Sequence, residues 1–282
     1  MYNFLFKISL CILIITSRHK YFIYGIIKFN IKVSPKEENK SMFRTIKWYF
    51  KFMFMLYITY PRLKKAENFL KNDELDKFYE YSFYQTSKWA MNRIKDSGAT
   101  INVYGKDNIP KDKNVVFISN HQGDFDIAIF MALIPKEKGF VAKIELNKIP
   151  ILRTWMKYIG CVFMDRKDLK QSLKTINEAI NFIKKGHSMV IFPEGTRSKC
   201  DTMGDFKAGS FKLATKTNTP IVPVTIDGSY KLKEKNKGRI KPDTVNVYIH
   251  KPVYTENMTN EEKEHLPITI KNIIQENLPK NA

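Results

Sequence analysis

The stretch VVFISNHQGDFDIAIFMALI (residues 115–134) places a polar turn between two apolar runs. The first run, VVFIS, is β-branched and aromatic, which is typical of a buried strand. The second run, DIAIFMALI, predicts a helix, and Asp124 stands just before it as a natural N-cap. A strand followed directly by a helix is a building unit of α/β domains. The stretch therefore predicts an α/β fold with the polar turn at the carboxyl end of a strand.

The segments around this stretch continue the alternation. Short β-branched or aromatic strands are predicted at INVY, NVVFIS, GFVAK, CVFMD, SMVIFP, PIVPVTI and VNVYIH. Helices are predicted over residues 168–185, 207–217 and 268–278. Strands that alternate with helices imply one α/β domain over residues 97–282, with a mixed, largely covered β-sheet and surrounding helices.

Two apolar segments precede this domain. Residues 8–17 are uncharged but short, because a bilayer-spanning helix needs about 20 apolar residues, and no secretory cleavage signal is evident. Residues 43–60 predict a helix with Arg44, Lys47 and Lys51 on one face and many aromatic side chains. This pattern favours an interfacial helix in an anionic leaflet, with a buried helix of a soluble domain as the alternative. We therefore expect membrane-associated helices before the α/β domain.

The N-terminal part divides into two expected regions. Residues 42–96 are predicted to hold the interfacial helix and a helical hairpin that ends at Ser97-Gly98. Residues 1–41 form an N-terminal extension. Our hypothesis is that Met42 is the natural start, because the codons just upstream can encode a ribosome-binding purine run. N-terminal sequencing of the natively expressed protein tests this, and a chain that begins at Met1 contradicts it.

The charge balance points to an anionic partner. The chain carries 48 basic and 28 acidic residues, a formal net charge of +20. Such an excess suits nucleic acid, an anionic membrane surface or a phosphorylated substrate, with a general lysine bias as the alternative. The basic segment of residues 231–241 is either a solvated hairpin or part of a binding site. Three cysteines without metal-ligand spacing indicate a reduced, cytosol-facing protein.

The polar turn holds the first candidate site. His121 falls between a strand and a helix, where α/β folds place their sites, and Asp126 falls in the first helical turn, within reach of it. A carboxylate bonded to one ring nitrogen leaves the other nitrogen as a proton acceptor. His187 and His250 show no metal-ligand spacing, so no metal site is predicted. Taken alone, the turn is as consistent with a structural role as with catalysis.

A second polar cluster, FPEGTRS (residues 192–198), follows another predicted strand. Arg197 offers a planar fork suited to a phosphate, and Glu194 can orient a hydroxyl or hold an arginine. A Glu–Arg surface turn is the alternative. GCVFMDR places Arg166 just past a strand, and in IVPVTI, a core segment, Pro223 is expected to interrupt strand pairing.

In this order, NHQGDFD, GCVFMDR, FPEGTRS and IVPVTI resemble the four blocks of the glycerophospholipid acyltransferase superfamily. The nearest match is its bacterial 1-acyl-glycerol-3-phosphate (lysophosphatidate) acyltransferase branch. AKIEL and FKAG also resemble intervening segments, so the similarity covers residues 100–252. The His-x4-Asp spacing is weak evidence alone, but in order with Glu-Gly-Thr-Arg it is highly specific.

The resemblance implies an enzyme of phospholipid biosynthesis, a 1-acylglycerol-3-phosphate O-acyltransferase that acylates the sn-2 hydroxyl of lysophosphatidate and gives phosphatidic acid. It implies that His121 is the general base and that Asp126 supports it. It also assigns Glu194 and Arg197 to the glycerol-phosphate end, with Arg166 implicated, and Lys143 is a weaker candidate for the phosphate or the oxyanion. The residues expected to bind substrate are therefore Arg166, Glu194, Gly195, Thr196, Arg197 and Lys143.

The expected partners follow from the same resemblance together with the basic charge and the predicted interfacial helix. The acyl donor is acyl carrier protein or coenzyme A as a thioester, used as a substrate, and no cofactor and no metal are expected. We expect an anionic phospholipid membrane as a partner, a peripheral or monotopic place on the cytoplasmic face of the cell membrane, and no nucleic acid. One alternative is an acyltransferase that acts on glycerol-3-phosphate or another lysophospholipid. A more distant alternative is a non-enzymatic basic membrane-binding protein.

Overall fold

A computed structural model gives the fold, and it describes residues 37–279. The expectations about the apolar residues 8–17, and about most of the N-terminal extension, fall outside these residues. The compact unit described below is Lys40–Ala282.

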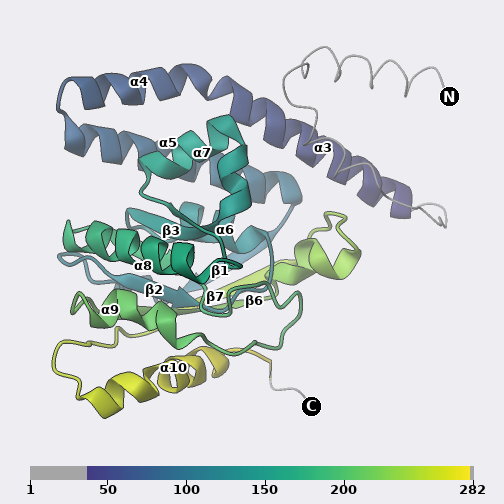
Figure 1. The fold of residues 1–282 in the computed structure, drawn as a ribbon. Coiled ribbons are helices and arrows are strands. Elements are labelled where there is room, and N and C mark those ends of the chain that lie inside the picture. Colours follow the sequence, from purple (N-terminus) through teal and green to yellow (C-terminus); the bar gives the residue numbers. More distant parts are fainter. Residues whose placement is uncertain (1–36, 280–282) are drawn as a thin grey trace. The chain divides into compact units, whose positions relative to one another are not determined.

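A seven-stranded sheet lies at the centre of this unit, in the order β1-β7-β6-β2-β5-β3-β4 (Figure 1). The strands are β1 (Thr100–Tyr104), β2 (Val116–Ser119), β3 (Lys138–Lys143), β4 (Val162–Met164), β5 (Ser188–Ile191), β6 (Ile221–Asp227) and β7 (Thr244–Ile249). Neighbouring strands are parallel except for β6 and β7, which are antiparallel. The predicted mixed sheet is confirmed, and every predicted strand is present.

Helices precede the sheet and connect its strands. The α-helices of the described residues are α3 (Glu37–Ile58), α4 (Tyr60–Lys71), α5 (Leu75–Ser97), α6 (Phe125–Leu133), α7 (Pro150–Tyr158), α8 (Leu169–Lys184), α9 (Lys212–Thr215) and α10 (Asn260–Gln275). Short 3-10 segments are η1 (Lys106–Asn108), η2 (Ile144–Lys148), η3 (Ala208–Phe211), η4 (Ser229–Leu232) and η5 (Glu234–Asn236).

The sheet is covered on both faces, because alternate side chains of each strand enter different cores. Phe117 of β2 packs in a core with residues of α5 and α6, such as Ile94 and Phe130. Its neighbours Val116 and Ile118 lie in a second core, which α8, α9 and α10 close. Figure 1 shows α5 above the sheet and α9 and α10 below it. The predicted covered sheet is therefore confirmed.

Helices are present in the N-terminal segment, as predicted, but their bounds differ; their predicted association with a membrane stays a prediction. Helix α3 begins before Met42, so the expected boundary between residues 41 and 42 lies inside a helix. The following stretch divides into α4 and α5, which lie side by side as a hairpin (Figure 1). It ends at Gly98, whose φ of 77° is left-handed, as the sequence predicts. None of the described helices is both long and apolar enough to cross a bilayer.

Helix α7 was not predicted. It has nine residues and begins at Pro150. Its Trp155 packs against Leu56 of α3 and Leu63 of α4, and the indole Nε1 donates to Thr59 Oγ1 at 2.9 Å. This small third core ties α7 to the N-terminal helices.

Pro223 lies inside a central strand rather than ending it. Pairing between β6 and β2 runs through Pro223, while the β6–β7 ladder begins one residue later, at Val224. The Pro223 carbonyl still accepts the His250 N–H at 3.0 Å. The expected interruption is thus wrong for the pairing with β2, because the missing proline N–H is not needed there.

Two predicted helices differ from the structure in extent. Helix α10 begins at Asn260 rather than residue 268, because Thr259 and Glu262 form a capping box ahead of Pro267. The helix predicted over residues 207–217 is instead the 3-10 segment η3 followed by the four-residue α9.

Candidate active site

Two polar turns meet at one edge of the sheet because β2 and β5 are parallel neighbours. The turns that follow their carboxyl ends are hydrogen-bonded to each other. Ser198 N donates to the His121 carbonyl at 2.8 Å, and Lys199 N donates to the Gln122 carbonyl at 3.1 Å. The structure therefore joins NHQGDFD to FPEGTRS, which are distant in the sequence.

His121 and Asp126 form a dyad in the first of these turns. Asp126 Oδ2 lies 2.7 Å from His121 Nδ1 and also accepts the Gly123 N–H at 2.9 Å. The Asp126 side chain is fully buried, whereas that of His121 is 12% exposed. The imidazole stacks on Phe192, with ring centroids 4.2 Å apart. When Nδ1–H is donated to the carboxylate, Nε2 is left as the proton acceptor, which is the arrangement that a general base requires.

Glu194 links its own turn to the His121 turn through hydrogen bonds to backbone N–H groups. Its Oε1 accepts the His121 N–H at 2.6 Å, and its Oε2 accepts the Gly204 N–H at 2.8 Å. Burial raises the pKa of the Glu194 carboxyl, and these two backbone donors oppose that rise. Gly195, next in the turn, has a left-handed φ of 71°, and Thr196 is exposed. Both oxygens of Glu194 are thus engaged by the protein itself.

Asp124 has a different role from the one expected. It stands at the N-cap position of α6 but makes no side-chain capping bond, because its own backbone is helical (φ −63°, ψ −27°). Its carboxylate instead pairs with Arg197 Nη1 and with Lys233 Nζ, the latter at 2.6 Å. The predicted capping bond is wrong, and Asp124 belongs to an ion-pair cluster at the site.

The basic segment of residues 231–241 reaches this cluster, which the sequence left open. Leu232 and Ile240 are fully buried and hold the segment against the domain. Lys233 and Glu234, which follow Leu232, were not among the predicted site residues. The apolar Leu232 and Ile240 in a run of lysines were the one available signal that the segment is packed rather than solvated.

Glu234 links the segment to both turns. Its Oε1 accepts the Asp124 N–H at 2.9 Å and Arg197 Nη1 at 3.1 Å. Its side chain is only 6% exposed, and burial raises its pKa. Arg197, predicted to bind phosphate, is thus held between two carboxylates and remains 35% exposed.

The remaining predicted residues lie at the same edge of the sheet. Lys143 ends β3, and Arg166 follows β4; β3 runs parallel to β5, and β4 runs parallel to β3. Burial lowers the pKa of Arg166, the Glu145 charge raises it, and the Arg197 charge lowers it. Lys143 pairs with Glu145 at 2.7 Å, and both side chains are exposed. Arg166 is therefore electrostatically coupled to Arg197, whereas Lys143 is engaged with an acidic neighbour.

Within residues 37–279, no three His, Cys, Asp or Glu side chains are grouped so that they could hold a metal ion. His187 stacks on Phe182, with centroids 4.1 Å apart, and His250 Nε2 lies 2.8 Å from Thr225 Oγ1. Neither histidine approaches the dyad.

Sequence relatives place these residues in a known family. A 1-acyl-sn-glycerol-3-phosphate acyltransferase of Borreliella burgdorferi is 32% identical over 182 residues, which make up 64% of this chain and 73% of that protein. The family model described as Acyltransferase matches residues 100–227, a range that contains the dyad and the FPEGTRS turn. The chain belongs to the acyltransferase family.

Further comparisons agree with this family. A chloroplast 1-acyl-sn-glycerol-3-phosphate acyltransferase of Brassica napus is 36% identical over 154 residues, 54% of this chain. The chain spans only 44% of that relative's length. The crystal structure of a 1-acyl-sn-glycerophosphate (LPA) acyltransferase from Thermotoga maritima is 28% identical, with a TM-score of 0.76. That match covers 86% of this chain and 95% of the other.

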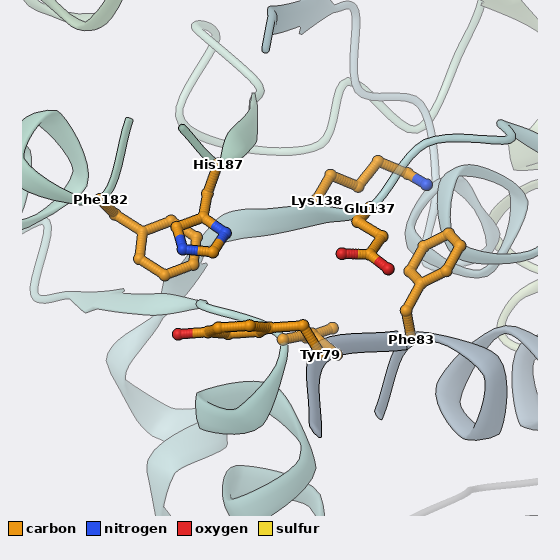
Figure 2. A pocket seen from close by; sticks show the side chains of 7 residues that line it. Tyr79, Phe83, Glu137, Lys138, Phe182 and His187 are labelled. Carbon is orange, nitrogen blue, oxygen red and sulfur yellow. The ribbon is translucent and has the colours of Figure 1, made fainter. Parts of the chain in front are cut away.

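A small pocket of this family member lies near the amino ends of β3 and β5, away from the dyad (Figure 2). Lys138 begins β3 and is almost fully buried in its wall. Its Nζ donates to the carbonyls of Ile134 and Lys136, both at 2.8 Å, and lies 4.7 Å from the centroid of the Phe83 ring. Burial lowers the pKa of Lys138 to about 7. A neutral amine has two N–H groups, and these two carbonyls satisfy both.

The stability of the fold is expected to depend on pH through Lys138. Its pKa is lower in the folded chain than in the unfolded chain, so the unfolded state binds more protons between about pH 7 and 10. The free energy of unfolding should therefore rise with pH across this window, by up to about 1.4 kcal/mol per unit. Urea unfolding at several pH values should show a flatter rise in K138M than in the exposed-lysine control K185M. Equal slopes in the two variants would contradict the prediction.

Proposed function

We propose that this protein transfers an acyl group from an acyl thioester to the sn-2 hydroxyl of 1-acyl-glycerol-3-phosphate, giving phosphatidic acid in phospholipid biosynthesis. The observation that carries the proposal is the buried Asp126–His121 pair beside Arg197, within the region that matches the acyltransferase family. The printed names of the relatives, which describe 1-acyl-sn-glycerol-3-phosphate acyltransferases, support this substrate.

The reaction needs a base and no covalent acyl-enzyme. His121 Nε2 takes the proton of the acceptor hydroxyl while Asp126 holds Nδ1–H and stabilises the imidazolium. The hydroxyl oxygen attacks the thioester carbonyl carbon, and the new C–O ester bond forms as the C–S bond breaks. The thiolate leaves and takes from His121 the proton that came from the acceptor hydroxyl. A thioester is already activated, so the step requires neither a metal nor a further cofactor.

The cations at this edge of the sheet suit a phosphate-bearing acceptor. Arg197 presents its guanidinium three residues beyond Glu194, and its charge lowers the pKa of Arg166. Their forks match phosphate oxygens better than a point charge does. Lys143 is the candidate for the oxyanion or a phosphate oxygen. In this proposal Glu194 acts as a positioning residue that holds the His121 backbone in place.

The acyl donor in this proposal is acyl carrier protein or coenzyme A. The formal charge of +20 favours both, because acyl carrier protein is acidic and coenzyme A is phosphorylated. The test is mass spectrometry of the products from purified protein given lysophosphatidate with each donor in parallel. Phosphatidic acid with one donor or both is expected. Product only from glycerol-3-phosphate, or only from another lysophospholipid, would contradict the acceptor.

We further propose that α3 binds the cytoplasmic face of an anionic membrane. Its outer face carries large exposed side chains at helical spacing: Phe43, Ile46, Phe50, Met53, Phe54 and Tyr57. Its inner face is fixed to the domain, since Trp48 Nε1 donates to the Arg93 carbonyl at 2.9 Å and Leu56 is buried. Such a helix, held on one side and apolar on the other, suits a headgroup boundary.

Membrane binding should fall sharply when two aromatic side chains of this face are replaced. Phe50 and Phe54 are 69% and 53% exposed, so F50S/F54S leaves the core untouched. We expect about 100-fold weaker partitioning, at roughly 1.5 kcal/mol for each phenyl ring kept out of lipid. The measurement is co-sedimentation with vesicles of phosphatidylglycerol and phosphatidylcholine.

The matched control for this experiment is L169S/L173S, which removes two exposed leucines from α8. It should bind the vesicles as the natural protein does. Equal loss of binding in both double variants would mean that α3 has no special role.

A further inference from the structure

The Asp124 carboxylate bridges two cations at the site, Arg197 and Lys233, which together we call the cradle. Asp124 Oδ1 pairs with Arg197 Nη1, and Asp124 Oδ2 pairs with Lys233 Nζ at 2.6 Å. One oxygen thus faces each cation, as two oxygens of a phosphate would. The Asp124 side chain is 45% exposed, so this carboxylate can leave the cradle for solvent.

The two partners of the Asp124–Lys233 ion pair each favour the charged form of the other. Burial alone would raise the pKa of Asp124, but Lys233 and Arg197 outweigh it and lower that pKa. Burial alone would lower the pKa of Lys233, but Asp124 and Tyr49 outweigh it and raise that pKa. The contact is therefore between full charges, and a more highly charged anion such as a phosphate monoester competes well for both cations.

Lys233 is fixed in place rather than free at the surface. It follows the fully buried Leu232, and its own side chain is 22% exposed. Its ammonium lies 5.5 Å from the centroid of the Tyr49 ring of α3. Glu234, the next residue, binds Asp124 N and Arg197 Nη1 and so sets the spacing of the two cations. The cradle is therefore held by three parts of the chain: the turns that follow β2 and β5, and the packed segment of residues 231–241.

The cradle also lies at the correct place relative to the base. Asp124 is three residues from His121 in the same turn, and the Ser198 N–H, next to Arg197, bonds the His121 carbonyl. In lysophosphatidate the free hydroxyl and the phosphate are on adjacent glycerol carbons. An acceptor phosphate at the cradle would therefore bring the neighbouring free hydroxyl to the turn that holds His121.

We infer that Lys233 binds the acceptor phosphate together with Arg197, and that Asp124 occupies their cradle until the phosphate displaces it. This inference rests on the proposed function and adds a specificity device to it. A neutral acceptor such as a monoacylglycerol brings no anion to displace Asp124. The site would thus select phosphorylated acceptors by requiring an exchange of anions.

The test compares variants that should move acceptor affinity in opposite directions. K233M should raise the KM for lysophosphatidate about ten-fold, and K233R should restore most of it, because one charge-assisted contact is lost and regained. D124N should lower the same KM several-fold, because the internal competitor is removed while the size is kept. K235M is the matched control from the same segment, because Lys235 is exposed. The KM of K235M for lysophosphatidate should equal that of the natural protein.

A second measurement separates this inference from the proposed function. Binding of sn-glycerol 3-phosphate by isothermal titration should weaken in K233M and tighten in D124N, whether or not the protein transfers acyl groups. Thermal unfolding shows whether each variant is folded. A K233M that matches K235M in KM and in binding would overturn the role of Lys233. A D124N that binds glycerol 3-phosphate more weakly would show that Asp124 positions the cations rather than occupying their site.

Discussion

Replacing His121 by alanine is expected to lower kcat for acyl transfer by about 10² to 10⁴-fold, the usual contribution of a positioned base. In the proposed mechanism the imidazole is the proton acceptor, and Asp126 cannot replace it because its carboxylate is fully buried. The KM for lysophosphatidate should change little, because the cations proposed to bind its phosphate are untouched. Initial rates with a saturating acyl donor measure both quantities.

The fold of H121A should survive, because the His121 backbone bonds to Glu194 and Ser198 do not involve the ring. H265A is the matched control, since His265 is an exposed residue of α10 and its loss should leave kcat unchanged. If H121A kept kcat within a few-fold of the natural value, another group would have to be the base.

Replacing Glu194 by glutamine is expected to damage the site and the fold together. Both carboxylate oxygens accept backbone N–H groups, from His121 and from Gly204, and an amide can accept only one of them. The other N–H then faces the amide nitrogen instead of an acceptor, and loss of this bond to a charged group should cost about 1–3 kcal/mol of stability. The kcat should fall at least about ten-fold, because a small displacement of a catalytic group lowers the rate of the chemical step strongly. The KM for lysophosphatidate should stay nearly constant.

The split between kcat and KM decides the role of Glu194. If Glu194 positions the backbone, E194Q should have a lower kcat and a lower unfolding temperature. If Glu194 instead contacts the glycerol hydroxyl, E194Q should have a higher KM and an unchanged unfolding temperature. S172A serves as a control for stability, since Ser172 makes a side-chain bond to the Asp165 carbonyl outside the dyad. A rise confined to KM in E194Q would return Glu194 to substrate binding.

The strands could be predicted from sequence because their signal is local. Each is a short β-branched or aromatic run, and the structure places all seven within two residues of their expected bounds. Helix limits depend on contacts that a pattern does not contain. Helix α10 starts early because Thr259 and Glu262 bond each other ahead of Pro267, and α7 packs through Trp155 into a core made by distant helices.

The site shows the same division. His121 and Asp126 are five residues apart, so one strand–turn–helix unit brings them together and the sequence can predict their contact. The bonds of Glu194 follow only from the adjacency of β2 and β5. The place of Lys233 depends on how a lysine-rich segment packs, and a run of lysines by itself is typical of solvent.

The backbone around His121 is not a strand, but its N–H and C=O groups are hydrogen-bonded as those of a strand are. The His121 N–H is bonded to a buried carboxylate, and the carbonyls of His121 and Gln122 accept N–H groups from the neighbouring turn. The amide protons of His121, Ser198 and Lys199 should therefore exchange with solvent slowly, as sheet amides do, in a region where loops usually exchange fast. If His121 is the base, it is preorganised, and the two proposed substrates must move to the histidine rather than the histidine to them.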